Sequence, residues 1–282
     1  MNPSHPYSAL TPDCALDALD ATGLKADGRL LALNSYENRV YQMGVEDAAA
    51  PVVVKFYRPE RWSDAAILEE HAFTAELAAR EIPVVAPLEL NGATLHTHAG
   101  FRFAVYPKQG GRMPEFERAD TLRRMGRFLG RIHAVGAQAD FAQRPTLDIA
   151  TFGTASRDFL RDGNWLPPDL VAAWDSVVEY ALAGVAHCYE RAGKVRAIRL
   201  HGDCHAGNVL WTAEGTHFVE FDDARVNEGA QCPCIVGRVC RSHRGEVLEG
   251  EVPADDRRSL HEIPRGLIET VQPRPEHLSH DF

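Results

Sequence analysis

The chain has 282 residues, of which 45% are hydrophobic and 25% are charged, a composition typical of a folded globular protein. Its net charge of −10 argues against binding to nucleic acid or to an anionic membrane, because phosphate-rich surfaces need a basic partner. No apolar run approaches the roughly 18 residues of a membrane helix, and six cysteines are too few for a disulfide scaffold. We therefore expect a cytoplasmic location, with neither a membrane nor a nucleic acid as partner.

Strands dominate the first 106 residues. A helix is predicted from the Thr11–Pro12 cap to about Gly23, and a longer one from Ser63 to about Arg80. The segment 51–57 is rich in β-branched and aromatic residues, which indicates a central strand. Further strands are predicted over 29–33, 39–43, 94–96 and 101–106.

Helices dominate the next part of the chain, with predictions over 119–135 and 169–191. A short strand over 197–200 and a hairpin with strands 209–212 and 217–221 follow. This order predicts an α+β fold with two lobes, a small β-rich N-terminal lobe over 1–106 and a helical C-terminal lobe over 107–225. Residues 226–282 contain only 14 Val, Ile, Leu and Phe, so we expect a disordered tail.

The most polar loop lies between the predicted strand 197–200 and the hairpin, and reads HGDCHAGN over 201–208. Its aspartate, Asp203, precedes Asn208 by five residues, and the hairpin ends in Glu220, Asp222 and Asp223. Phosphoryl transfer needs these residue types, namely a carboxylate that accepts a hydroxyl proton and oxygen ligands for Mg²⁺.

A lysine on an earlier strand should hold the phosphates of the nucleotide, and Lys55 lies in such a strand. Because a lysine inside a central strand needs a charged partner, the following helix offers Glu69 or Glu70. Two other interpretations of the polar loop stay open: a metal site formed by His201, Asp203 and His205, and a turn without chemistry. The arginines at 123, 124, 127 and 131 recur at helical spacing, either as a solvated helix face or as a surface for an acidic or phosphorylated substrate.

Four segments carry a resemblance to a known family: LNSYENRVY (33–41), VKFYRPERW (54–62), LEEH (68–71) and LHGDCHAGN (200–208). They resemble the bacterial stress response kinase A family, which belongs to the aminoglycoside phosphotransferase and choline kinase branch of the protein-kinase-like fold. The resemblance covers about residues 30–225. It implies an ATP- and Mg²⁺-dependent serine/threonine protein kinase that is cytoplasmic, acts as a monomer and phosphorylates a protein hydroxyl.

The resemblance also implies roles for individual residues. Asp203 would accept the proton, and Asn208 with Glu220 or Asp222 would bind Mg²⁺. Lys55 would contact the α- and β-phosphates with Glu70 as its partner on the helix. Ser35 would lie in the loop that covers the nucleotide, and Tyr106 near the adenine. His201 would brace the loop rather than react.

The sequence departs from the family pattern at two places. The family has an aspartate where this chain has Glu220, whose extra methylene shifts the carboxylate by about 1.5 Å against the strict geometry of Mg²⁺. On a strand, Asp222 would point to the same face and could replace it. The second departure is that the match ends after Arg225, whereas the family continues with several helices, so the resemblance implies an incomplete helical lobe.

Two alternatives to a protein kinase follow. One is a phosphotransferase for a small molecule such as an aminoglycoside, choline or homoserine. The other is a catalytically impaired ATP-binding protein, a pseudokinase or truncated product.

Overall fold

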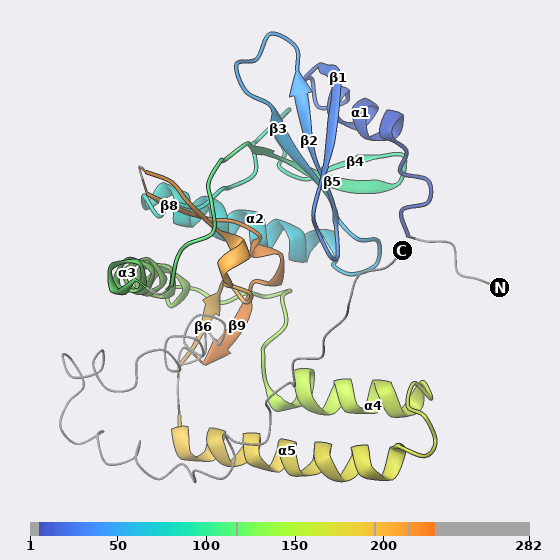
Figure 1. Cartoon of the computed structure of the whole chain (residues 1–282), viewed down its shortest axis with the longest axis vertical. Helices are drawn as coiled ribbons and strands as arrows, with labels where there is room; N and C mark the ends of the chain where they lie inside the picture. The colour runs from blue at the N-terminus through green and yellow to red at the C-terminus, as the bar shows by residue number, and fades with distance from the viewer. Residues whose placement is uncertain (1–5, 117, 195, 214, 229–282) are drawn as a thin grey trace, which may run out of the picture. The chain divides into compact units, whose positions relative to one another are not determined.

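The computed structural model describes residues 6–116, 118–194, 196–213 and 215–228. Of the tail expected over 226–282, residues 229–282 lie outside the described residues. An antiparallel sheet in the order β1-β2-β3-β5-β4 forms the N-terminal part (Figure 1). Its strands are β1 (Ala26–Leu33), β2 (Arg39–Val45), β3 (Val52–Phe56), β4 (His96–His98) and β5 (Phe101–Pro107). The prediction of a central strand over 51–57 is confirmed, because β3 pairs with β2 on one side and β5 on the other.

Alternation along β3 separates the core from the site. Val52, Val54 and Phe56 belong to a buried apolar cluster with residues of helix α1 (Pro12–Asp20). Since successive strand residues point to opposite faces, Val53 and Lys55 face the other way and line a cavity. The strand pattern therefore places the lysine on the cavity side.

Helix α2 (Asp64–Ala79) follows the sheet, and the Ser63 hydroxyl caps it by accepting the backbone N–H of Ala66 at 3.2 Å. Phe73 and Leu77 of α2 pack in a second apolar cluster with Met125 and Ile132 of helix α3 (Ala119–Gly136). Helix α2 thus carries residues of both the cavity and the second core.

The remaining elements lie after α3. They are η1 (Ile149–Thr154), α4 (Ala155–Asp162), α5 (Val171–Ala192), β6 (Ala197–Leu200), η2 (Ala206–Asn208), β7 (Val209–Trp211), β8 (Thr216–Phe218), η3 (Phe221–Asp223) and β9 (Arg225–Glu228). The hairpin prediction is confirmed, because β7 pairs with β8. Strand β9 pairs with β6 through Glu228, so ordered pairing extends three residues beyond the predicted start of the tail.

Helices α4 and α5 have no buried residue. The segment that contains them, residues 155–192, exposes several large apolar side chains, among them Phe159, Trp165 and Tyr180. No helix in the described ranges combines the length and the apolar character needed to cross a membrane.

Candidate active site

One cavity of about 800 Å³ collects every residue that the sequence singles out for catalysis or binding. These residues are Ser35, Lys55, Glu70, Tyr106, Asp203, Asn208, Glu220 and Asp222. They come from the β1–β2 loop, β3, α2, β5 and the segments around β7 and β8. Their roles stay predictions, but the fold brings all of them together.

Lys55 is the cation at the centre of this cavity and is almost fully buried. Its Nζ lies 3.4 Å from Glu70 Oε1, 3.7 Å from Asp222 Oδ1 and 3.8 Å from Glu220 Oε2. Burial alone would lower the pKa of Lys55, but the surrounding anionic groups, Glu70 foremost, raise the pKa well above its ordinary value. The lysine is therefore positively charged and available to an anionic ligand.

Adjacent glutamates of α2 have different partners, which answers the question of which one pairs with the lysine. Glu70 faces Lys55, whereas the Glu69 carboxylate accepts backbone N–H groups of residues 142, 143 and 144 at 2.6, 2.9 and 3.1 Å. Burial raises the pKa of Glu70 to about 7, although Lys55 acts in the opposite direction. Glu69 instead fixes the loop that follows α3.

His201 braces the polar loop from inside the fold. Its Nε2 donates to the Val219 carbonyl at 2.9 Å, and its Nδ1 lies 3.4 Å from the backbone N of Asp203. Burial lowers the pKa of His201 to about 4, so the ring is neutral and can accept and donate at the same time. Gly202 follows at φ +84°, where a Cβ would lie 1.8 Å from the Asp223 carbonyl oxygen, so the loop requires glycine at this position.

Asp203 and Asn208 are held together on the cavity wall. Asn208 Nδ2 donates to the Asp203 carbonyl at 2.8 Å and lies 3.5 Å from Asp203 Oδ2. The Asp203 side chain is 42% exposed, with His205 Nε2 at 3.6 Å from Oδ2. The carboxylate is therefore reachable from the cavity.

The expectation that Glu220 and Asp222 share one face of a strand is wrong. Strand β8 ends at Phe218, Glu220 has left-handed backbone angles of φ 61° and ψ 60°, and residues 221–223 form a turn of 3₁₀ helix. The two carboxylates nevertheless meet at Lys55, because the turn redirects the chain. Burial works against ionisation of Asp222, but Lys55 and Arg61 lower its pKa overall.

Three further residues support the acidic segment and were not assigned roles from the sequence. Asn38 Nδ2 donates to Asp222 Oδ2 at 3.2 Å, and Arg61 Nη2 donates to Asp223 Oδ1 at 2.9 Å. Arg144 donates to the carbonyls of Asp222 and Ala224 from a buried position. Asn38 and Arg61 lie in the motif segments 33–41 and 54–62, whereas no sequence pattern marks Arg144.

The side chains of the cavity offer oxygen ligands for a metal ion. Within the described ranges, no group of three or more His, Cys, Asp and Glu side chains forms a preassembled site, which gives no support to a metal loop at His201, Asp203 and His205. Asp222 Oδ1 is buried without a hydrogen-bond donor, and the Asn208 amide lies in the same cavity. These oxygens fit Mg²⁺, which binds through one or two protein oxygens together with water and phosphate.

Comparison with known proteins agrees with this arrangement. The model of the phosphotransferase enzyme family matches residues 29–228, and the chain belongs to that family. Structural similarity to solved enzymes supports a protein-kinase-like fold, in which the antiparallel sheet forms the N-terminal lobe.

Named relatives lie among bacterial stress kinases. The chain is 44% identical over 231 residues to stress response kinase A of Escherichia coli K12, covering 82% of this chain and 69% of that protein. It is 43% identical over 219 residues to the serine/threonine protein kinase RdoA of Salmonella typhimurium, covering 78% and 66% of the two chains. The chain is therefore a kinase of the phosphotransferase family.

Two solved structures show the same fold at low sequence identity. A microcompartment-associated aminopropanol kinase has a TM-score of 0.63 at 17% identity, covering 86% of this chain and 82% of that chain. Amicoumacin kinase hAmiN in complex with AMP-PNP, Ca²⁺ and Ami has a TM-score of 0.58 at 20% identity, covering 77% of this chain and 66% of that chain.

Proposed function

We propose that the chain is an ATP- and Mg²⁺-dependent protein kinase that transfers the γ-phosphoryl group to a serine or threonine hydroxyl. The observation that carries this proposal is the buried Lys55–Glu70 pair in the same cavity as Asp203, Asn208 and the acidic turn. The relatives at 43–44% identity, named as stress response and serine/threonine kinases, favour a protein acceptor.

Each residue has a distinct part in this proposal. Lys55 binds the nucleotide phosphates, and Glu70 holds the lysine in place. Asn208 and Glu220 or Asp222 would hold Mg²⁺, which neutralises phosphate charge when bound. Ser35 lies in the loop over the nucleotide, and Tyr106 lies where the first lobe joins the second.

Asp203 performs the proton transfer. Its exposed carboxylate orients the acceptor hydroxyl and takes its proton as the oxygen attacks the γ-phosphorus. Asn208 donates a hydrogen bond to the Asp203 carbonyl, and neutral His201 accepts one from the Asp203 backbone N–H. These contacts position the carboxylate before the substrate binds.

The test is phosphate transfer by the purified chain, with a panel of proteins and a panel of small amino alcohols, sugars and antibiotics as acceptors. Asp203→Asn should lower kcat by about 10²–10⁴, the usual contribution of a positioned general base. Asp140→Asn is the matched control, because Asp140 is exposed and lies outside the cavity.

The outcomes separate the alternatives. Phosphate on serine or threonine of proteins supports the proposal, whereas transfer confined to the small molecules replaces it with a small-molecule kinase. Nucleotide binding without turnover on either panel would identify a catalytically impaired protein. Unchanged turnover in Asp203→Asn would remove the assigned base.

A further inference from the structure

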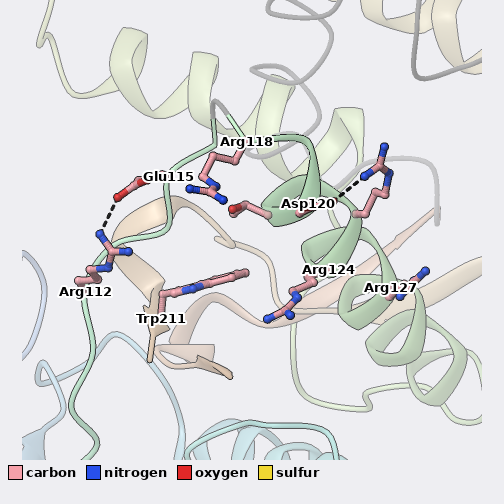
Figure 2. Close-up of a pocket in the computed structure, with 9 residues that line it drawn as sticks. Arg112, Glu115, Arg118, Asp120, Arg124, Arg127 and Trp211 are labelled. Atoms are coloured by element: carbon pink, nitrogen blue, oxygen red, sulfur yellow. Dashed lines mark hydrogen bonds and ion pairs between the residues drawn. The ribbon is translucent and has the colours of Figure 1, made fainter. Parts of the chain in front are cut away.

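A second pocket, of about 620 Å³, is lined by arginines and lies outside the candidate active site (Figure 2). Its charged residues are Arg112, Glu115, Arg118, Asp120, Arg123, Arg124 and Arg127. Among the described residues of the pocket, five arginines against two carboxylates leave three excess positive charges, in a chain whose net charge is −10. This pocket, which we call the arginine pocket, is therefore basic in an acidic protein.

The carboxylates of the arginine pocket are already paired. Arg112 Nη1 binds Glu115 Oε1 at 2.5 Å, and Arg123 Nη1 binds Asp120 Oδ1 at 2.6 Å (Figure 2). Within the described ranges, Arg118, Arg124 and Arg127 have no carboxylate partner. Three exposed guanidinium groups are thus available to a ligand.

Trp211 forms the apolar wall of the pocket. The Arg124 guanidinium carbon lies 5.8 Å from the centre of its ring, and Figure 2 shows Arg118 and Arg124 near the indole. The segment between β5 and α3, which we call the linker, is fixed to β7 by backbone hydrogen bonds of 3.0 and 2.7 Å between Arg112 and Trp211. The wall and one arginine are therefore held by backbone as well as side-chain contacts.

The start of α3 strengthens the preference for an anion. This helix has 18 residues, and its N-cap residue Arg118 makes no side-chain capping bond. The free N–H groups and the helix dipole add partial positive charge where the arginines gather. Two guanidinium groups together bind a phosphate ligand more tightly than a carboxylate ligand, because the phosphate oxygens accept several paired N–H hydrogen bonds at once.

The arginine pocket adjoins the candidate active site. Leu210 of β7 lines the active-site cavity, and its neighbour Trp211 lines the arginine pocket. The linker is shared in the same way, with Gln109 at the cavity and Arg112 at the pocket. Because successive strand residues point to opposite faces, a ligand in the arginine pocket would lie across β7 from the cavity in which phosphate transfer is proposed.

We infer that the arginine pocket binds a phosphorylated serine or threonine of a protein substrate, so that an existing phosphate docks the substrate on β7, the strand that also lines the active-site cavity. This inference rests on the proposed protein kinase function for the class of its partner. The volume of the pocket suits one phosphorylated side chain with its neighbours, and the acidic net charge opposes a nucleic acid.

Binding is measured without ATP, so the result does not depend on turnover. The probes are three fluorescent pools of random peptides, with a fixed phosphoserine, serine or glutamate at the centre, and anisotropy is the readout. The phosphoserine pool should bind at least about tenfold more tightly than the serine pool, because charge-assisted hydrogen bonds are lost with the phosphate. The glutamate pool should lie between them.

The test variant is Arg118→Gln combined with Arg124→Gln, and both side chains are exposed. It should weaken binding of the phosphoserine pool by about tenfold or more. The control, Arg191→Gln combined with Lys194→Gln, removes the same charge at two exposed positions outside the pocket and should retain the binding. A thermal unfolding curve for each variant shows that the fold persists.

Several outcomes would overturn the inference. These are equal binding of the phosphoserine and serine pools, unchanged binding in the Arg118/Arg124 variant, or displacement of the peptide by an equal concentration of inorganic phosphate, which would indicate a site for the free anion. If peptide binding fails while protein phosphorylation is observed, only the arginine pocket is refuted. If binding holds and no phosphorylation occurs, the proposed function fails and the pocket stands.

Discussion

Asn38 and Asp222 are joined by a hydrogen bond of 3.2 Å although they lie 184 residues apart in the chain. Asn38 belongs to the loop between β1 and β2, and Asp222 to the acidic turn after β8. The Asn38 side chain also accepts the backbone N–H of Arg58 at 3.1 Å. One buried amide thus connects the loop, the segment after β3 and an anion beside Lys55.

Asn38→Ala should lower the free energy of unfolding by about 1–3 kcal/mol, because buried Asp222 loses a donor and the Arg58 N–H loses its acceptor. Urea unfolding measures the loss. Asn34→Ala, in the same loop at an exposed position, is the control and should cost much less. Equal losses in the two variants would show that the loop, and not this bond, determines the effect.

Arg144→Met should destabilise the protein by about 3–5 kcal/mol, the usual cost of removing one partner of a buried ionic network. The arginine lies 3.9 Å from Glu70 and donates to two carbonyls of the acidic turn, which would be left without their donor. Urea unfolding of this variant is compared with that of Arg191→Met, a change on an exposed side chain of α5. A loss below about 1 kcal/mol would contradict the assigned role.

The pH dependence of stability should report on Glu70. Its pKa is raised from 4.5 to about 7, so between these values the folded chain holds a proton that the unfolded chain has released. The contribution to stability is complete below pH 4.5 and is lost as the pH rises through 7. From pH 5 to pH 7, the wild type should therefore lose about 2 kcal/mol relative to Glu70→Gln. Urea unfolding at both pH values measures this difference, and parallel profiles of the two proteins would contradict it.

The proposed role of Glu220 as a Mg²⁺ ligand can be tested with two variants, one that removes the charge of its side chain and one that shortens it. Glu220→Gln should raise the Mg²⁺ concentration for half-maximal turnover by about tenfold or more, since metal affinity follows the charge of the ligands. Glu220→Asp should restore the metal dependence, and its shorter side chain suits the left-handed backbone at this position. Equal Mg²⁺ dependence of wild type and Glu220→Gln would assign the carboxylate ligand to Asp222 alone.

Local patterns in the sequence predicted the elements that carry the site. The β-branched segment became β3, the Ser63 cap began α2, and the strand 197–200 was predicted with the bounds that β6 has in the structure. Each of these signals is contained in a few neighbouring residues. Together with the motif residues, they were enough to place Lys55, Glu70 and the polar loop at one cavity.

Features that depend on distant contacts were not predicted. Arg144 matters because α2 and the acidic turn meet around it, and neither lies near it in the sequence. The acidic segment 220–223 was predicted to continue the hairpin strand, but the left-handed backbone of Glu220 turns the chain into a 3₁₀ turn. Strand β9 was missed because its pairing with β6 spans almost 30 residues. Helix α4 was missed because its eight residues make barely two turns, too short a segment for a helical pattern to stand out.

Helix α2 contacts the second lobe at three positions along its length. Glu69 binds the loop at 142–144, Glu76 binds Arg199 at 2.8 Å, and Phe73 is fully buried in the second core. In kinases that are regulated by movement of the corresponding helix, a swing breaks the lysine–glutamate pair and stops catalysis. In this protein, the same movement of α2 would also break its contacts with the loop at 142–144, with Arg199 and with the second apolar cluster. We therefore expect α2 to hold the Lys55–Glu70 pair in place before any ligand binds, without a separate activating movement.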